Sequence, residues 1–526
     1  MTAETENLRT KKGFLQFISS SLIFWLLLTA AVALVPTIHF GYSPDSAHLI
    51  DIARNLSNGE GLSTYYLSVG DTTIPSKEVM WPPLYPLILM IFMKLGFSVG
   101  LACRLVNVIS FVVISWFLFC TGRGYKPQLL SILSVGFWLI MVMNLLVANY
   151  AWSEPLFMAI VSIGLLCLYR IIRNEKYSMA QFLILGIIAG FAALCRYIGI
   201  TMLFPPVFLV FILLKKKKLG IGKSVKNCLA VAVGFSLVFL PYLAYNLVQT
   251  KDFLPVNHAQ AELSIIYNSF HLAKSILEDF IPILIVIGVL LFIFYDRSWR
   301  VFRTDIKKSF DIYIITICSW VMAYFLSMLF LTSYLSIDEM NTRFTSPAYP
   351  AMIFVVGHLI VRLINGKLSD QHKSSIGIAF LIFAVILSAL HVSKIEIQDL
   401  QRHKAHKKDD GYIHLSEWIE SSTSQRDLFI GEPIWEVRFR ADRVVLESVY
   451  PDQPKLTPSA IEDFLRRLGS RFDSFYYIAE KNRAPDFSGD LGEEFSEHNM
   501  YLRHIIDFDY CNRPVVVYKL EYIPKH

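Results

Sequence analysis

Long apolar segments recur through the first three quarters of this sequence and constrain its fold more than any other feature. A helix that spans a bilayer needs ~20 mostly apolar residues, with a lower limit of ~17. Segments of about this length occur at 14–36, 99–121, 128–148, 155–173, 180–195, 197–214, 227–248, 281–296, 310–335, 345–364 and 375–392. We therefore predict a polytopic α-helical membrane protein with about eleven spans.

The composition agrees with a membrane protein. Hydrophobic residues make up 54% of the chain and charged residues 17%, whereas a soluble domain is about half apolar and about a quarter charged. The formal net charge of +6 comes from basic residues scattered between the apolar segments, without a basic stripe on one face. This pattern indicates membrane topology, and we expect no nucleic-acid partner.

The loop charges predict which side of the membrane each loop faces. Short loops rich in Lys and Arg stay in the cytoplasm, and the loops 37–80, 149–154, 249–279 and 336–344 are acidic or neutral. The basic loops and the acidic or neutral loops lie on opposite sides of the membrane only if Pro82–Phe97 does not cross it. We therefore expect a half-embedded juxtamembrane helix at Pro82–Phe97. We predict a multi-pass protein of the cell (inner or plasma) membrane. Its N-terminus is inside and 14–36 is a retained anchor.

The character of the chain changes after Val392. Residues 393–526, which we call the tail, alternate helix-like and strand-like stretches of the size of one small α/β domain. The predicted elements are helices at Ile413–Ser421 and Pro458–Leu468 and strands at Asp427–Ile430, Arg443–Glu447, Ser474–Ala479 and Pro514–Leu520. We therefore divide the chain into a transmembrane domain, 1–392, and an extracytoplasmic α/β domain, 393–526.

The loop 37–80, which we call the first loop, opens with a predicted helix. Ser43 is a favourable N-cap, Pro44 suits the first helical position, and Asn58–Gly59 ends the helix. Asp45 falls in the first turn, on the apolar side of the helix, and so points toward the protein or membrane rather than water. A carboxylate at a partly dry site suits a general base. The alternative is an acidic residue that only stabilises the helix start.

Three further charged residues lie at outer ends of predicted spans. Glu154 in NYAWSEP stands at the hydrophobic boundary, where an ionisable group is costly and so indicates a functional site. Arg196, in the turn Cys195–Arg196–Tyr197, needs an anionic partner such as Glu154 or a ligand phosphate. Arg343 in MNTRFTSPAYP binds the same cluster or meets lipid headgroups.

Other residues near these motifs are candidates for substrate binding. His48 lies on the polar side of the first-loop helix, and Arg54 follows on the same helix. Tyr85, in EVMWPPLYPLIL, is a candidate for substrate binding, and the alternative is that it anchors an amphipathic helix at the membrane interface. Tyr197 stands beside Arg196. The outer loops contain no GxxxxGK, HExxH, GxSxG or DxD-like motif, so we expect no metal and no cofactor.

At these residues the sequence resembles the GT-C glycosyltransferases that use polyprenyl-phosphate sugars, in particular the protein O-mannosyltransferases and the lipid A aminoarabinose transferases. The strings SPDSAHLIDIARNLSNGEG, WPPLYPL, NYAWSEP, GIIAGFAALCRYIGI and RFTSPAYP are similar to the family's landmarks and stand in the same order. Two positions depart from the pattern. Ser46 follows Asp45 where many members have Glu, and Trp81 stands where close relatives have a phosphate-binding Lys.

The resemblance implies an enzyme that transfers a sugar from a polyprenyl-phosphate donor to an acceptor hydroxyl, with inversion. It implies that Asp45 is the catalytic carboxylate and Glu154 a second active-site acid. The phosphate-binding role passes to Arg196, Arg54 or Arg343, because Trp81 replaces the family's Lys. The expected partners are the donor lipid, a glycan, lipid or protein acceptor, and the membrane.

Two other functions fit parts of the sequence. A flippase or transporter for lipid-linked saccharides would also use membrane arginines and carboxylates, but nearer the midplane and often with repeat symmetry. A polysaccharide polymerase or ligase would centre its site on a large later outer loop, and 249–279 is a possible seat for it. The clustering of candidates at outer span ends favours the transferase.

Overall fold

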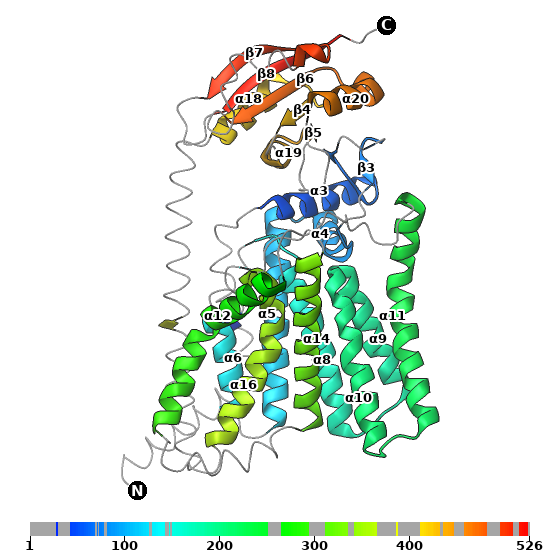
Figure 1. Cartoon of the computed structure of the whole chain (residues 1–526), viewed down its shortest axis with the longest axis vertical. Coiled ribbons are helices and arrows are strands. Elements are labelled where there is room, and N and C mark those ends of the chain that lie inside the picture. The colour runs from blue at the N-terminus through cyan, green and yellow to red at the C-terminus, as the bar shows by residue number, and fades with distance from the viewer. Residues whose placement is uncertain are drawn as a thin grey trace.

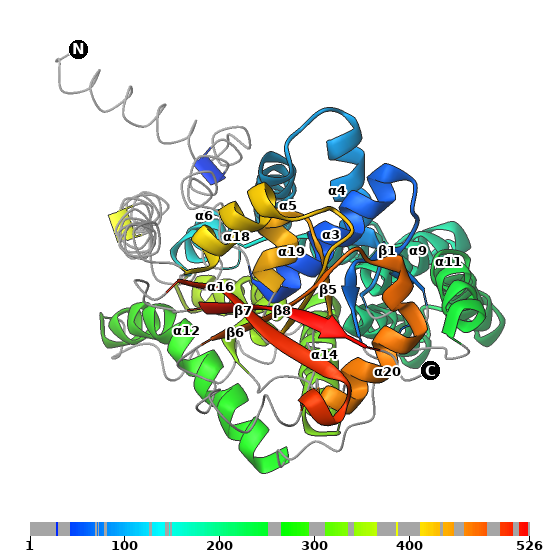
Figure 2. The same ribbon diagram turned by 90° about the horizontal axis from the view of Figure 1, so that it is seen from above.

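The computed structural model describes residues 28–29, 43–68, 71, 73–77, 81–125, 129–141, 147, 150–250, 265–293, 311–334, 341–364, 386–387, 411–431, 435–446, 457–480, 495–508 and 515–523. In this part of the chain, helices stand side by side as a bundle (Figure 1). A β-sheet lies beyond one end of the bundle, and helix α3 lies between the two. Seen from above, the sheet and α3 lie over the bundle (Figure 2).

Six helical segments in the described residues are long and apolar enough to cross a membrane. They are α5 (Val99–Gly124), α8 (Glu154–Asn174), η2 with α10 (Tyr197–Leu203 and Phe204–Lys215), α11 (Ile221–Thr250), α14 (Ile312–Tyr334), and α15 to α16 with η3 between them (Thr342–Thr345, Ser346–Ala348 and Tyr349–Ile364). The helices α4 (Leu84–Lys94), α6 (Leu129–Ile140) and α9 (Met179–Cys195) are apolar but shorter. A further helix, α12, comprises residues Ile265–Ile293. The predicted helical membrane architecture is confirmed.

The number of spans, expected to be about eleven, stays a prediction. The predicted segments 14–36 and 375–392 lie outside the described residues except for 28–29 and 386–387. Helix α4 falls within Pro82–Phe97 and has 11 residues, fewer than the ~17 that a span needs. It packs against α3 through Leu49 and Tyr85, which share one buried apolar cluster.

Close packing of α9 against α11 explains the small residues of GIIAGFAALC. A Cβ added at Gly186 would lie 2.2 Å from the carbonyl oxygen of Val231, and one at Gly234 would lie 2.2 Å from that of Leu183. Small residues let the backbones of membrane helices approach this closely. The contact fixes the end of α9, and Arg196 follows directly as its C-cap residue.

Helix α3 (Pro44–Asn58) begins and ends where the sequence predicts. The Ser43 side chain accepts a hydrogen bond from the Ser46 backbone N–H, and Pro44 is the first helical residue. Gly59 ends the helix with φ +86°, a left-handed conformation that glycine adopts without a steric cost. These local signals place Asp45 in the first turn of α3.

The sheet has six strands in the order β2-β5-β4-β6-β8-β7. The strands are β2 (Tyr66–Leu67), β4 (Leu428–Gly431), β5 (Val444–Leu446), β6 (Phe475–Glu480), β7 (Met500–Phe508) and β8 (Val515–Tyr522). The pairs among β2, β5, β4 and β6 are parallel, and β8 pairs antiparallel with β6 and β7. The first loop thus contributes the edge strand β2 to a sheet otherwise built from the tail. In addition, β1 (Ser63–Thr64) and β3 (Ser76–Lys77) pair within the loop.

Helices cover both faces of this sheet because side chains alternate along each strand. Leu428 and Ile430 pack with α20 (Pro458–Leu468) on one face. Phe429 packs on the other face with α18 (Gly411–Ser422) and α19 (Trp435–Ala441). Ala47 of α3 belongs to this second buried cluster, so α3 is packed between the tail and the bundle.

Candidate active site

The carboxylate of Glu154 is fully buried at the start of α8. Its Oε1 atom lies 2.7 Å from Nη1 of Arg196 and 2.5 Å from Nε of Arg343. A buried charge is tolerated when it is paired and hydrogen-bonded, and two guanidinium groups supply the pairing here. The second oxygen, Oε2, is buried and receives no hydrogen bond from the described residues.

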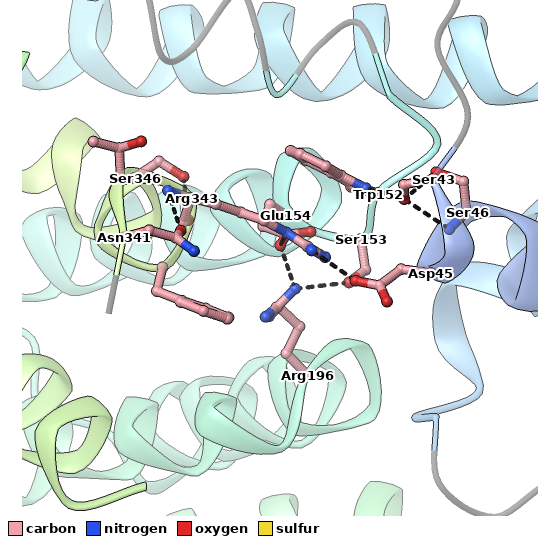
Figure 3. Close-up of polar contacts among 12 residues, drawn as sticks. Ser43, Asp45, Ser46, Trp152, Ser153, Glu154, Arg196, Asn341, Arg343 and Ser346 are labelled. Carbon is pink, nitrogen blue, oxygen red and sulfur yellow. Dashed lines mark hydrogen bonds and ion pairs between the residues drawn. The ribbon is translucent and has the colours of Figure 1, made fainter. Parts of the chain in front are cut away.

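Arg343 connects Glu154 to Asp45 of the first loop. Its Nη1 lies 2.6 Å from Oδ2 of Asp45, while its Nε binds Glu154. Figure 3 shows the Arg343 side chain extended between the two carboxylates. Asp45 is 28% exposed and Arg343 15%, so the contact lies at the rim of the buried cluster. The four side chains predicted to converge are brought together, and their formal charges sum to zero.

Trp152 aligns Arg343 with the start of α3, a role that the sequence did not predict. The Arg343 guanidinium carbon lies 4.1 Å from the centre of the Trp152 ring, a favourable cation–π distance. The indole N–H of Trp152 donates to Ser43 Oγ at 2.8 Å. Because Ser43 caps α3, one tryptophan contacts both the arginine and the cap of the helix that carries Asp45.

Arg196 reaches Glu154 from the other side of the carboxylate than Arg343 (Figure 3). It follows α9, and its Nη1 also donates to Ser153 Oγ at 3.2 Å. Tyr197 turns to α11 instead, where its hydroxyl lies 2.9 Å from that of Tyr242. Tyr242 donates in turn to the carbonyl of Trp81 at 3.2 Å. Tyr197 therefore links α11 to the loop before α4, beside the cluster rather than in it.

The remaining candidates have other surroundings. Tyr85 is fully buried between α3, α4 and α5. Arg54 faces the tail, where Nη1 donates to the carbonyl of Phe439 at 3.5 Å and the guanidinium carbon lies 5.7 Å from the Phe439 ring centre. His48 is 5% exposed and stacks on Tyr66 at 4.0 Å. Burial lowers the pKa of His48 to about 4, against the opposing influence of nearby aspartates.

The polar side of α3 is buried, although a polar stripe commonly faces water. His48, Asp51 and Asn55 are each at most 5% exposed. Residues after α3 and helix α19 of the tail cover this side: Asn55 donates to the carbonyl of Ser63 at 2.8 Å, and Asp51 accepts from Arg438. Among the described residues, no group of three His, Cys, Asp or Glu side chains could hold a metal ion.

The charged cluster joins the start of α3 to the start of α8, at the end of the helical bundle that α3 and the sheet cover (Figure 1). The chain is similar to a family model described as "Dolichyl-phosphate-mannose-protein mannosyltransferase", which matches residues 81–245. That segment contains Glu154 and Arg196. No match was found among curated protein sequences.

Solved structures share the fold over almost the whole chain. ArnT from Cupriavidus metallidurans bound to undecaprenyl phosphate is 12% identical with a TM-score of 0.61, covering 94% of this chain and 97% of that chain. The apo state of the same protein is 15% identical with a TM-score of 0.60, again covering 94% of this chain and 97% of that chain. The archaeal oligosaccharyltransferase AglB from Archaeoglobus fulgidus, in complex with an inhibitory peptide and a dolichol-phosphate, is 10% identical with a TM-score of 0.51 and covers 88% and 70%. The resemblance to GT-C glycosyltransferases predicted from the sequence is confirmed.

Proposed function

We propose that the protein transfers a sugar from a polyprenyl-phosphate donor to an acceptor hydroxyl on the extracytoplasmic side of the membrane, with inversion. The observation that carries this proposal is the single cluster formed by Asp45, Arg343, Glu154 and Arg196 at the end of a GT-C-type bundle. The loop charges support the extracytoplasmic placement of this end and of the tail.

The two arginines suit the phosphate of such a donor. Guanidinium groups bind phosphate oxygens through paired hydrogen bonds and keep their charge at any physiological pH. Arg196 is 18% exposed and Arg343 15%, so each is held by the protein yet accessible at one edge. Undecaprenyl phosphate and dolichol-phosphate are bound in the two similar structures, ArnT and AglB. We assign Arg196 and Arg343 to the donor phosphate.

The reaction is a single displacement at the anomeric carbon. The acceptor oxygen forms the new bond to that carbon, and the bond from the carbon to the phosphate oxygen breaks. The leaving phosphate changes from a diester with one negative charge to a monoester with two, so the arginines bind the products of bond cleavage more strongly than the donor. Asp45 accepts the proton of the acceptor hydroxyl.

The same arginine that binds the phosphate also binds the proposed base. A phosphate beside Arg343 competes with Asp45 for the guanidinium group, because both are anions that seek the same N–H donors. Donor binding therefore weakens the hold of Arg343 on Asp45 and leaves its carboxylate available as a proton acceptor. This coupling frees the Asp45 carboxylate from Arg343 when the donor is in place.

Glu154 has two tasks in this proposal. Through Oε1 it holds the guanidinium groups of Arg196 and Arg343 side by side. Its negative charge offsets the repulsion between these two positive groups. Its Oε2 is buried without a hydrogen bond among the described residues, and buried acceptors of this kind ordinarily have a partner. A hydroxyl group of the donor sugar would supply that hydrogen bond.

Four other candidates support the site from its edges. Tyr85 packs under α3, and Tyr197 fixes α11 beside the loop before α4. His48 and Arg54 contact Tyr66 and Phe439 respectively. We propose that these four residues hold the walls of the substrate site rather than the reacting atoms.

A reconstituted assay tests the proposed function. The purified protein in liposomes is given a panel of labelled polyprenyl-phosphate sugars with candidate lipid, glycan and peptide acceptors, and the anomeric configuration of the product is determined. We expect transferred sugar with the configuration opposite to that of the donor. Movement of labelled lipid across the bilayer without sugar transfer would contradict the proposal in favour of a flippase, and retained configuration would contradict a single displacement.

A further inference from the structure

Asp51 of α3 is a buried carboxylate that the proposed reaction does not use. It is 1% exposed and accepts three hydrogen bonds, and a second nitrogen of Arg438 lies within ion-pair distance of it. Oδ1 accepts a hydrogen bond from Nε of Arg438 at 2.8 Å and lies 2.6 Å from Nη2 of the same guanidinium group. Oδ2 receives the Thr64 hydroxyl and the Tyr65 backbone N–H, both at 2.8 Å. Asp51 therefore joins three segments: α3, the chain that follows it, and α19 of the tail.

Arg438 is held as firmly as its partner. It is 6% exposed, its guanidinium carbon lies 4.5 Å from the centre of the Tyr65 ring, and Nη1 lies 2.8 Å from Asp442. A buried ion pair adds little to stability over an apolar pair of the same shape, but it specifies one arrangement, because any other leaves a charge unpaired in the interior. The Asp51–Arg438 pair thus fixes how α3 meets α19.

Besides the Asp51–Arg438 pair, a strand pairing also joins the chain after α3 to the tail. Strand β2 pairs parallel with β5, with Tyr66 opposite Val445 and Leu67 opposite Leu446. Tyr66 also stacks on His48 of α3 at 4.0 Å. The helix that carries Asp45 and the strand after it are therefore anchored to the same sheet, which otherwise comes from the tail.

The geometry of α3 transmits this anchoring to Asp45. Asp51 and Asp45 stand six positions apart on one continuous helix, about 9 Å along its axis at 1.5 Å per residue. A helix of this length moves as a rigid rod, so a tilt at Asp51 displaces Asp45 relative to Arg343. A displacement of about 1 Å at a reacting group can cost ~100-fold in rate.

We propose that Arg438 of the tail is a positioning residue for the active site, which holds α3 through Asp51 so that Asp45 meets the acceptor and Arg343 in the reactive geometry. This inference rests on the proposed function. It gives the tail a part in the reaction, since the site is complete only when the tail is docked on α3.

The test compares Arg438→Gln with Arg440→Gln in the full-length protein in liposomes. Arg440 lies on the same helix and is exposed, so it controls for the loss of one arginine from α19. For Arg438→Gln we expect kcat to fall ~10- to 100-fold, the KM for the donor to change less than ~2-fold, and the amides of 44–58 to exchange hydrogen faster. Arg440→Gln is expected to match the unaltered protein.

A second variant provides rescue. In Asp51→Asn with Arg438→Gln, the two amides keep a hydrogen bond without a buried unpaired charge, so kcat is expected to recover at least ~5-fold over Arg438→Gln alone. A merely additive loss would overturn the pairing. If Arg438→Gln does not fold, Arg438→Lys replaces it, since Lys keeps the charge but not the two-nitrogen contact. Unchanged kcat in that variant overturns the proposal.

The two proposals fail in different ways. If the unaltered protein transfers no sugar, the proposed function fails, and hydrogen exchange of α3 still decides whether Arg438 holds the helix. If the protein transfers sugar but folded Arg438→Gln shows normal kcat and normal exchange of 44–58, the positioning role is wrong and the proposed function stands.

Discussion

Arg343 binds Asp45 across 2.6 Å from Nη1 to Oδ2, and this contact joins the first turn of a loop helix to the start of a membrane-spanning helical segment. The two residues belong to segments far apart in the sequence. The same guanidinium group reaches Glu154 through Nε. The relationship of Asp45 to Arg343 is the geometric basis of the proposed reaction, because one arginine contacts both the base and the site assigned to the phosphate.

Arg343→Lys tests whether this bridge needs the guanidinium shape. An ammonium group is a compact point charge and does not span two carboxylates as the arginine fork does. We expect kcat to fall ~100-fold and the donor KM to rise. The assay is turnover in liposomes, with Arg362→Lys, an exposed position on the same span, as the matched control. Normal turnover in Arg343→Lys would exclude a bidentate role.

Glu154→Gln tests the buried acid. Its loss leaves Arg196 and Arg343 facing one another with only Asp45 to balance them, and removing one partner of a buried ion pair costs about 3 kcal/mol or more. We expect a lower thermal unfolding midpoint in detergent together with weaker donor binding. Glu175→Gln, which is 66% exposed at the other end of α8, should leave both quantities unchanged. Equal midpoints for the two variants would mean that Glu154 is dispensable for the cluster.

His48 predicts a pH dependence of stability. Burial lowers its pKa from 6.5 to about 4, so between these values the unfolded chain binds a proton that the folded chain does not. The free energy of unfolding then falls as the pH drops from 6.5 to 4, by on the order of 1 kcal/mol per pH unit from this residue. His48→Gln should unfold with a shallower dependence over that window. The same pH dependence of the free energy of unfolding in both proteins would contradict a lowered pKa for His48.

Local signals predicted much of this structure. The cap at Ser43, the proline after it and the glycine at position 59 set the bounds of α3. Short apolar runs placed β4, β5, β6 and β8, and Pro458 marked the start of α20. These features depend on neighbouring residues, which a sequence displays directly. The charges at the ends of spans also indicated the cluster, because ionisable groups are costly there.

Features that depend on distant contacts were missed. Strand β2 has two residues, Tyr66 and Leu67, too few to show an alternating pattern, and it forms because β5 offers an open edge. The strand β7 and the helix α19 were also not predicted. Asp51 and Arg438 each resemble an ordinary surface charge until the fold brings them together. The aromatic residue in NYAWSEP, Trp152, was a signal that could have been used.

Asp45→Asn tests whether Asp45 is the general base of the proposed transfer. Asn keeps the shape of the side chain and can stay at the helix start, and the ion pair that it removes is partly exposed, so the free energy of unfolding should change by about 1 kcal/mol or less. It cannot accept the proton of the acceptor, and general-base catalysis is worth ~10²–10⁴-fold. The measurement is turnover of a labelled polyprenyl-phosphate sugar, with donor binding and folding checked on the same samples. The control is Asp463→Asn, which is 61% exposed in the tail. We expect loss of sugar transfer with donor binding retained in Asp45→Asn, and normal transfer in Asp463→Asn. Near-normal turnover in a folded Asp45→Asn protein would exclude Asp45 as the general base.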